Sequence, residues 1–184
     1  MIRRILDILL AVFISILISP IFLFLTILGY LNSGSPFYTQ LRIGINEQPF
    51  MLIKFRSMKI NTTYTLSHKV EKSQITSYGN FIRKYKLDEL PQLWNILRGD
   101  MSFVGPRPNL INHNSLICLR RQRNLYSILP GLTGYAQING IGMDNEKILV
   151  EYDEKNLNHT DLGFYFYCIL ITLKRILHED NRKD

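Results

Sequence analysis

The sequence predicts a mainly helical α/β protein, in which an N-terminal membrane helix precedes a small domain with a short β-hairpin and amphipathic helices. Three observations predict this fold class. The stretch from Ile8 to Leu31 is uncharged and far more apolar than anything after it. Two short runs on either side of Gly44 have the pattern of a hairpin, and later segments combine apolar with basic residues as amphipathic helices do. We therefore divide the chain into a membrane segment, 1–33, and a domain, 34–184.

The apolar stretch contains Ser19-Pro20 near its middle. A straight helix of its length rises about 36 Å, enough to cross a hydrocarbon core of about 30 Å. Pro20 removes one helical hydrogen bond, so the helix should kink or break there, and Ser19 can help to satisfy the carbonyls that are freed. Two half-helices hinged at this point would enter and leave through the same face. From these residues alone, a single span and a re-entrant element both stay open.

The domain carries an excess of positive charge. The formal net charge of the chain is +7 and its pI is about 9.5, which indicates an anionic partner such as nucleic acid, lipid headgroups or phosphorylated small molecules. No groove-reading module or stacking platform is recognisable, so nucleic acid is not an expected partner. The two cysteines and four histidines lack metal-binding spacing, so neither a zinc site nor a structural disulfide is expected.

A hairpin is predicted from Pro36–Ile43 and Phe50–Met58, joined by a turn that contains Gly44 and Asn46. On the second strand Lys54 and Arg56 are two residues apart and therefore share a face. Two cations placed in this way can hold an anion, and they can equally belong to a solvated strand face.

The remaining elements are predicted from periodicity and terminators. The polar segment 59–78 indicates a long loop. Helices are expected at 79–86, at 91–97 with Gly99 as its C-cap, and at 110–126, where Arg120 should lie on the surface and attract headgroups. The apolar run 162–173 is too short to span a membrane, which leaves a core helix or an interfacial one.

The densest cluster of unusual residues lies between these helices. Asp88 and Glu89 precede the helix at 91–97, where backbone N–H groups favour negative charge. Adjacent carboxylates at a phosphate site can hold Mg²⁺, and one of them can attack phosphorus. They can also be ordinary helix-capping acids. Pro106 and Pro108 hold Arg107 in a rigid frame suited to a phosphate contact, although an ordinary turn explains the same residues.

Taken together, these motifs resemble the monotopic phosphoglycosyl transferases, the bacterial sugar transferase family that loads a sugar phosphate onto undecaprenyl phosphate. The resemblance covers most of the chain, as a minimal catalytic core, and its motifs come in the family's order. They are Lys54-Phe-Arg-Ser-Met58, Leu87-Asp-Glu-Leu-Pro-Gln-Leu93, Arg98-Gly-Asp-Met-Ser-Phe-Val-Gly-Pro-Arg-Pro108 and Pro130-Gly-Leu-Thr-Gly-Tyr-Ala-Gln-Ile-Asn-Gly140. The match is thinner at 150–154, which weakens any transfer of sugar-binding roles to that stretch.

The resemblance implies a fold, a place and a reaction. The helix broken at Ser19 and Pro20 would be re-entrant, and the enzyme would sit on the cytoplasmic face of the bacterial inner membrane among its phospholipids. The reaction would transfer a sugar 1-phosphate from a UDP-sugar to undecaprenyl phosphate and release UMP. A homodimer is left open. The competing hypothesis is a catalytically inactive membrane scaffold for other glycosyl transferases.

The resemblance also implies roles for particular residues. Asp88 is similar to the nucleophile that forms a phosphosugar-aspartate intermediate, and Glu89 to its partner, which assists through Mg²⁺ or proton transfer. Both carboxylates are the expected Mg²⁺ ligands. Lys54, Arg83 and Arg107 match basic positions that bind the substrate phosphates.

Overall fold

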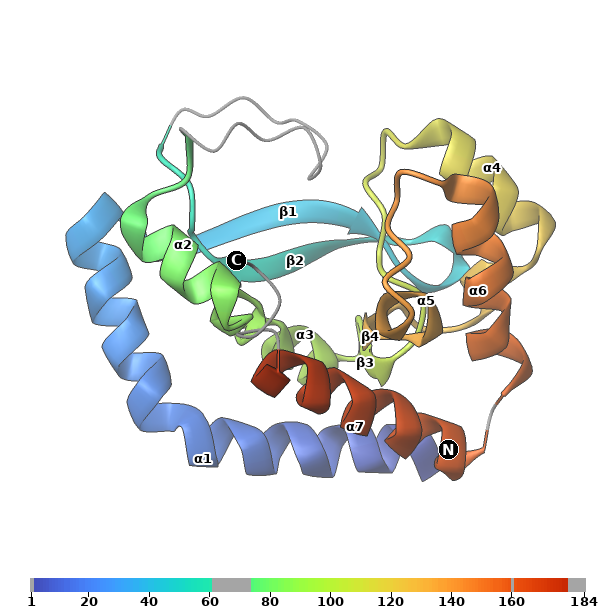
Figure 1. The fold of residues 1–184 in the computed structure, drawn as a ribbon, viewed down its shortest axis with the longest axis horizontal. Coiled ribbons are helices and arrows are strands. Elements are labelled where there is room, and N and C mark those ends of the chain that lie inside the picture. Colours follow the sequence, from blue (N-terminus) through green and yellow to red (C-terminus); the bar gives the residue numbers. More distant parts are fainter. Residues whose placement is uncertain (1, 61–73, 160, 179–184) are drawn as a thin grey trace.

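A long, bent helix, α1 (Ile2–Ser33), runs along one edge of the molecule, and the other elements lie on one side of it (Figure 1). The computed structural model describes residues 2–60, 74–159 and 161–178. Together with two small sheets, the helices confirm the mainly helical α/β class. The other elements are β1 (Phe37–Ile43), η1 (Ile45–Glu47), β2 (Pro49–Phe55), α2 (Ser77–Lys84), η4 (Leu87–Glu89), α3 (Gln92–Arg98), β3 (Ser102–Val104), α4 (Asn114–Gln122), η5 (Leu125–Ser127), β4 (Gly131–Thr133), α5 (Tyr135–Ile138), α6 (Glu146–Asn158) and α7 (Leu162–His178).

The proline of α1 bends the helix but does not interrupt it. Helical structure is continuous through Pro20, and the ribbon changes direction part-way along (Figure 1). Proline at position 20 cannot donate to the carbonyl four residues earlier, which is that of Ile16. The hydroxyl of Ser19 donates to this carbonyl instead, at 2.8 Å. The expected compensation by Ser19 is confirmed. Of the two outcomes expected at Pro20, a kink or a break, the helix has a kink.

The surface of α1 remains largely apolar and exposed. By length and composition α1 could cross a membrane, and only 11% of its most apolar window is buried, unlike the core helix of a soluble protein. The helix also begins earlier than the apolar stretch, because its first polar residues are bonded to the domain. Arg4 donates to the carbonyls of Ile96 and Leu97, at 2.6 and 2.9 Å, and so caps the C-terminal end of α3.

Both ends of α1 are fastened to the same body. Near the N-terminus the buried carboxylate of Asp7 accepts hydrogen bonds from Ser102, from the backbone N–H of Phe103 and from the Tyr165 hydroxyl. Beyond the bend, the Tyr78 hydroxyl of α2 donates to the carbonyl of Leu25, at 2.9 Å. Elements that are distant in sequence therefore hold the two halves of α1 in one arrangement.

The hairpin forms as predicted, with small differences at its ends. Strands β1 and β2 pair antiparallel from Phe37 opposite Phe55 to Ile43 opposite Pro49. The second strand ends at Phe55, three residues before the predicted end. The turn is the 3₁₀ helix η1, in which Asn46 has a left-handed φ of 52°, a conformation that asparagine tolerates well. The rings of Phe37 and Phe55 stack at 5.4 Å and pack with Phe22 of α1, so the hairpin is anchored on the bent helix.

Helices α2 and α3 agree with the predicted helices to within two residues at each end. Helix α2 starts at Ser77, because the side chain of Thr76 caps it by accepting from the Gly79 N–H. Helix α3 ends at Gly99, which adopts a φ of 95° as the expected C-cap. Most of the predicted loop, residues 61–73, lies outside the described residues.

The parallel pairing of β3 with β4 was not predicted. The two strands have three residues each, and Ser102 lies opposite Gly131 and Val104 opposite Thr133. The chain leaves β3 through Gly105, where a Cβ would lie 2.3 Å from the carbonyl oxygen of Leu129. Only glycine permits this approach, which brings the segment after β3 against the segment that leads into β4.

The predicted helix 110–126 is wrong in extent. Helix α4 covers only Asn114–Gln122, and Asn124, with a φ of 54°, separates it from η5. The expectation for Arg120 is also wrong: its guanidinium is buried, 2% exposed, and paired with Asp153 of α6 at 2.6 Å. Helix α6 was not predicted, and nothing in the sequence pattern at 110–126 indicates that a partner carboxylate covers this arginine.

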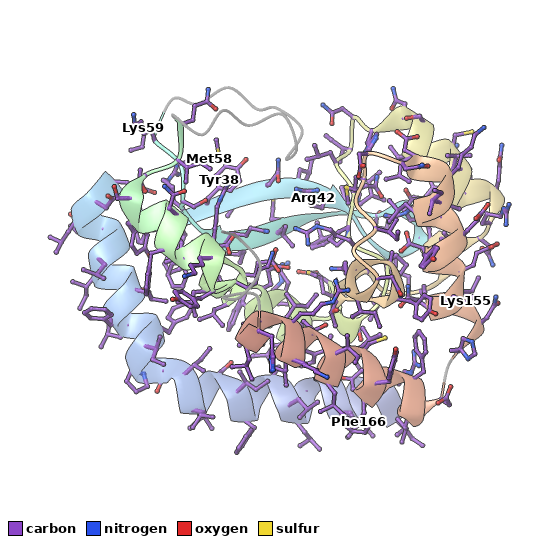
Figure 2. The ribbon with its side chains drawn as sticks, in the orientation of Figure 1. Tyr38, Arg42, Met58, Lys59, Lys155 and Phe166 are labelled. Carbon is purple, nitrogen blue, oxygen red and sulfur yellow. The ribbon has the colours of Figure 1, made fainter. Side chains whose placement is uncertain are left out.

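Helix α7 is a core helix along one face and exposes apolar side chains along another. Tyr165 and Cys168 are fully buried in the main core cluster with Ala11 of α1. Other apolar side chains of the same helix are exposed, among them Phe166, which points away from the hairpin (Figure 2). The helix thus contributes to the core on one face and leaves an apolar face beside α1.

Candidate active site

The two candidate carboxylates lie between α2 and α3. Lys86 adopts a left-handed φ of 56° after α2 and turns the chain into η4, which contains Asp88 and Glu89. This short 3₁₀ helix leads directly into α3 and contacts β2. The turn places both carboxylates beside the hairpin strand that carries Lys54.

Glu89 holds two of the predicted cations. Its Oε1 atom lies 2.8 Å from Nζ of Lys54 and 3.1 Å from Nη2 of Arg107. Burial, the largest single influence, raises the pKa of Glu89, but Lys54 and Arg107 together outweigh it and hold that pKa well below its usual range. Glu89 is therefore ionised throughout the physiological pH range, and it fixes a lysine and an arginine from distant segments side by side.

Asp88 has different surroundings. Its side chain is buried, and within residues 2–60, 74–159 and 161–178 no donor bonds its carboxylate. Burial raises the pKa of Asp88 above its ordinary value of 3.8, and the positive charges of Lys54, Arg83 and Lys86 oppose this effect. Asp88 is thus a poorly solvated carboxylate among cations, as a nucleophile toward an anionic phosphate requires.

Arg83 approaches Asp88 from α2. Its Nε atom donates to the hydroxyl of Ser57 at 2.8 Å, which orients the guanidinium from the end of the hairpin. Arg56 does not join the site, although it shares a strand face with Lys54. Its guanidinium binds the carbonyls of Ser35 and Phe37, at 3.1 and 3.2 Å, and holds the chain where it enters β1.

A small pocket opens over the Lys54, Glu89 and Arg107 cluster. Arg42, Gln92 and Pro108 are among its other lining residues. Burial, helped by the charge of Arg107, lowers the pKa of Arg42 to about 10. Three cations and a glutamate around one pocket form a site for an anion of high charge, such as a diphosphate.

Sequence reasoning missed Arg42 and Gln92. Strand alternation could have indicated Arg42. Tyr38 lies opposite Lys54 in the hairpin, and Arg42, four residues further along the same strand, points to the same face as Tyr38. Arg42 and Lys54 therefore share a sheet face. Figure 2 shows Arg42 near the end of β1 that leads toward α4. Gln92 had no such signal, since its burial depends on how α3 packs against the hairpin.

The donor chemistry of the site fits a magnesium ion that is held only in part by protein. In the described part of the chain, no three acidic, histidine or cysteine side chains gather as a metal cage. Mg²⁺ commonly binds through one or two carboxylates together with the phosphates of a substrate. Asp88 supplies an unbonded carboxylate and Glu89 a second, already tied to cations through Oε1, so the two residues match this mode.

The sequence is similar to those of known proteins. Residues 1–179 match the family described as bacterial sugar transferases. Among curated proteins, the chain is 34% identical over 176 residues to the uncharacterized sugar transferase EpsL of Bacillus subtilis, a match covering 95% of this chain and 87% of that one. It is 33% identical to the UDP-glucose:undecaprenyl-phosphate glucose-1-phosphate transferase of Escherichia coli and 37% identical to that of Klebsiella pneumoniae.

The coverage of these relatives is uneven. The matches cover 94% and 95% of this chain but only 39% and 38% of the E. coli and K. pneumoniae proteins. The chain thus spans less than half the length of these two relatives. The similarity nevertheless extends over nearly every described element, from α1 to α7, and it confirms the resemblance found in the motifs. The chain belongs to the bacterial sugar transferase family, the family of phosphoglycosyl transferases.

Proposed function

We propose that the protein transfers a sugar 1-phosphate from a UDP-sugar to undecaprenyl phosphate and releases UMP. The observation that carries this proposal is the contact of Glu89 with both Lys54 and Arg107 beside the buried carboxylate of Asp88. The names of the E. coli and K. pneumoniae relatives state this type of transfer for UDP-glucose. The reaction would be a membrane step in the assembly of a surface glycan.

The reaction proceeds in two displacements. The Asp88 carboxylate attacks the β-phosphorus of the UDP-sugar, forming a carboxylate–phosphorus bond and breaking the bond from that phosphorus to the bridging oxygen, which leaves with UMP. An oxygen of undecaprenyl phosphate then attacks the same phosphorus. The carboxylate of Asp88 is released, and the sugar is left on a lipid diphosphate. Covalent catalysis of this kind divides one difficult transfer into two easier ones.

The cations bind and orient the phosphates through both steps. Lys54 and Arg107 lie on the pocket side of Glu89, where they can contact the diphosphate, and Arg83 lies near Asp88. A Mg²⁺ ion bound by Asp88, Glu89 and the substrate phosphates would neutralise charge that develops on the leaving oxygens. Glu89 keeps the two cations at a fixed separation, which lowers the cost of ordering them when the substrate binds.

We infer further that α1 is a re-entrant membrane element and that the domain lies on the cytoplasmic face of the bacterial inner membrane, against phospholipids. The support is that α1 bonds to the same domain both before and after its bend, at Arg4 and at Leu25, while most of its apolar surface stays exposed. The division into a membrane segment, 1–33, and a domain, 34–184, belongs to this proposal. A homodimer remains a prediction that no contact of this chain addresses.

The proposed reaction is tested by incubating the purified protein, Mg²⁺ and undecaprenyl phosphate with a panel of UDP-sugars and measuring UMP. We expect UMP release with at least one UDP-sugar, dependent on the lipid for turnover beyond one equivalent. The extracted lipid should carry the sugar, linked to undecaprenol through a diphosphate. If no member of the panel releases UMP from the folded protein in membranes, the transferase proposal fails, and the inactive scaffold becomes the better description.

A further inference from the structure

Two buried arginines hold the loop that carries Arg107. Nη1 of Arg120, from α4, donates to the carbonyl oxygen of Arg107 at 2.8 Å. Nη1 of Arg42, from β1, donates to the next carbonyl, that of Pro108, at 3.0 Å. The side chain of Arg107 itself extends to Glu89. Arginines from two different elements thus fix consecutive peptide groups of a loop whose one charged side chain points into the pocket.

Arg120 does not line the pocket, but its side chain bonds to the loop that carries Arg107. Besides the Arg107 carbonyl, it donates to Oδ1 of Asn109 at 2.9 Å and to Oδ2 of Asp153 at 2.6 Å. Arg120 and Asp153 are 2% and 1% exposed. It is not among the residues that line the pocket over Glu89, so any effect of Arg120 on a bound phosphate must pass through the loop.

Burying this ion pair is expensive. The desolvation of two charges commonly cancels the gain from their attraction, so a buried salt bridge is weak evidence for a role in stability alone. Here the guanidinium is also aimed at a particular backbone position. Asn109 is fixed from two more sides, because the Tyr126 hydroxyl donates to its Oδ1 at 3.0 Å and its carbonyl accepts from Ile43 N–H at 3.1 Å. The network determines where the Arg107 side chain begins.

We propose that Arg120, held by Asp153, is a positioning residue for Arg107. The planar guanidinium donates in several fixed directions at once, whereas a lysine ammonium at the same place lacks that fork. Loss of the fork frees the Arg107 carbonyl to rotate and displaces the guanidinium from the phosphate position. The inference rests on the proposed function where it is tested by the rate of UMP release. Its test by pyrophosphate binding does not depend on that function.

A neighbouring ion pair supplies the matched control. Arg123, at the end of α4, pairs with Glu154 of α6 at 2.8 Å, so it joins the same two segments as Arg120 and Asp153. Arg123 is 50% exposed, and among the described residues its guanidinium bonds only to Glu154. Suppose that Arg120 served only to join α4 to α6. Then Arg120→Lys could reduce activity more than Arg123→Lys does, but neither loss would depend on whether Arg107 is present.

The test is a double-mutant cycle with two readouts, the kcat/KM for UMP release and the Kd for inorganic pyrophosphate by calorimetry. We expect Arg120→Lys to lower kcat/KM and pyrophosphate affinity by about 10-fold or more when Arg107 is present, and by less than about 3-fold in an Arg107→Ala background. Arg123→Lys should change neither value more than about 2-fold. Tyr126→Phe removes one hydroxyl from the network and should give a smaller loss that also requires Arg107.

The outcomes separate the two proposals. Equal losses with and without Arg107, or no loss in its presence, would overturn the positioning role while leaving the transferase function intact. If the protein releases no UMP but pyrophosphate affinity still depends on Arg120 only when Arg107 is present, the transferase proposal fails and the positioning role stands. Should Arg120→Lys not fold, Tyr126→Phe decides by the same criterion, since its ring still fills the site.

Discussion

Asp88 and Glu89 are adjacent, yet their carboxylates have opposite electrostatic surroundings. Lys54 and Arg107 bond to Glu89 and hold its pKa low, whereas burial raises the pKa of Asp88 and no described donor bonds it. A carboxylate that is already neutralised by two bonded cations is a weak nucleophile. The less solvated, unbonded carboxylate is the better candidate to attack phosphorus.

Substitution of each acid should separate these roles. We expect Asp88→Asn to lower UMP release by at least about 10³-fold and to abolish trapping of a phosphosugar on the protein, because an amide cannot form the acyl phosphate. Glu89→Gln should be severely impaired but should still form the adduct slowly, since Asp88 remains. Mass spectrometry of the intact protein after reaction with the UDP-sugar alone measures the adduct. Appreciable turnover by Asp88→Asn would refute its assignment as nucleophile.

The pKa shifts predict a bell-shaped pH profile. Asp88 must be ionised to attack, so kcat/KM should rise with pH through a pKa above the ordinary 3.8. Lys54 must be protonated to bind phosphate, and its pKa is lowered by burial from 10.5, with Glu89 opposing that effect. On the alkaline side, kcat/KM should therefore decrease through a pKa below 10.5. Lys54→Arg should move only the alkaline limb, to higher pH, and the exposed Lys147→Arg should move neither limb.

Arg107 offers a test of geometry at constant charge. Within the described part of the chain, its guanidinium bonds only through Nη2, to Glu89. The side chain is 40% exposed and lines the pocket, so its other N–H groups remain available to a ligand. Arg107→Lys keeps the charge but loses the fork. A lost charged hydrogen bond of about 1.5 to 3 kcal/mol corresponds to about a 10- to 150-fold fall in kcat/KM. Arg123→Lys, on the exposed pair, should be nearly silent, and equal effects at the two positions would contradict a specific contact.

At the scale of elements, local signals predicted much of the fold and long-range contacts supplied the rest. The hairpin and α3 were predictable because alternation, Asn46 and Gly99 act within a few residues. The β3–β4 pair was not, since strands of three residues have no periodicity and their pairing depends on the close approach at Gly105. The same reason explains the wrong expectation for Arg120, whose partner lies 33 residues away.

The candidate site, too, could be predicted only in part from the sequence. The motifs indicated Asp88, Glu89 and Arg107, and the fold brings Glu89 into contact with both Lys54 and Arg107. The resemblance implied different roles for the two acids, but the motifs could not provide the difference in their electrostatic surroundings, because it depends on which cations bond to which carboxylate. They also could not provide the buried arginines behind the loop, since a basic residue on an amphipathic pattern usually lies in solvent.

At the scale of the whole molecule, α1 has an exposed apolar surface and is also bonded to the domain through both of its halves. Helix α7 runs alongside the first half of α1 (Figure 1). Like α1, it has exposed apolar side chains, among them Phe166, Leu170 and Leu173. The buried side of α1 is bonded to the domain on either side of Pro20. A helix held in this way cannot place its two ends on opposite sides of a bilayer without giving up one set of domain contacts.

Cysteine labelling tests this topology directly. Two variants in a Cys118→Ser background, Ile2→Cys and Asn32→Cys, each introduce an exposed thiol at one end of α1. The native protein, labelled separately at its exposed Cys118, marks the side of the domain. With an impermeant reagent, we expect all three thiols to be protected in intact cells and labelled in inverted vesicles. Labelling of either end of α1 from outside would exclude a re-entrant helix in the native protein.

The same assay can show whether the bend maintains the topology. Replacing Ser19-Pro20 by Ala-Ala restores the helical N–H and removes the ring clash, so the straight helix becomes long enough to span. A straight helix must then compete with the contacts of Arg4, Asp7 and Leu25, so we expect a mixed population in which part of the Ile2→Cys label becomes accessible from outside. The control Ser15→Ala changes a serine of the same helix without affecting the proline and should leave the labelling as in the native protein. If Ala-Ala also leaves every thiol on the domain side, the domain contacts, and not the proline, determine how α1 lies in the membrane.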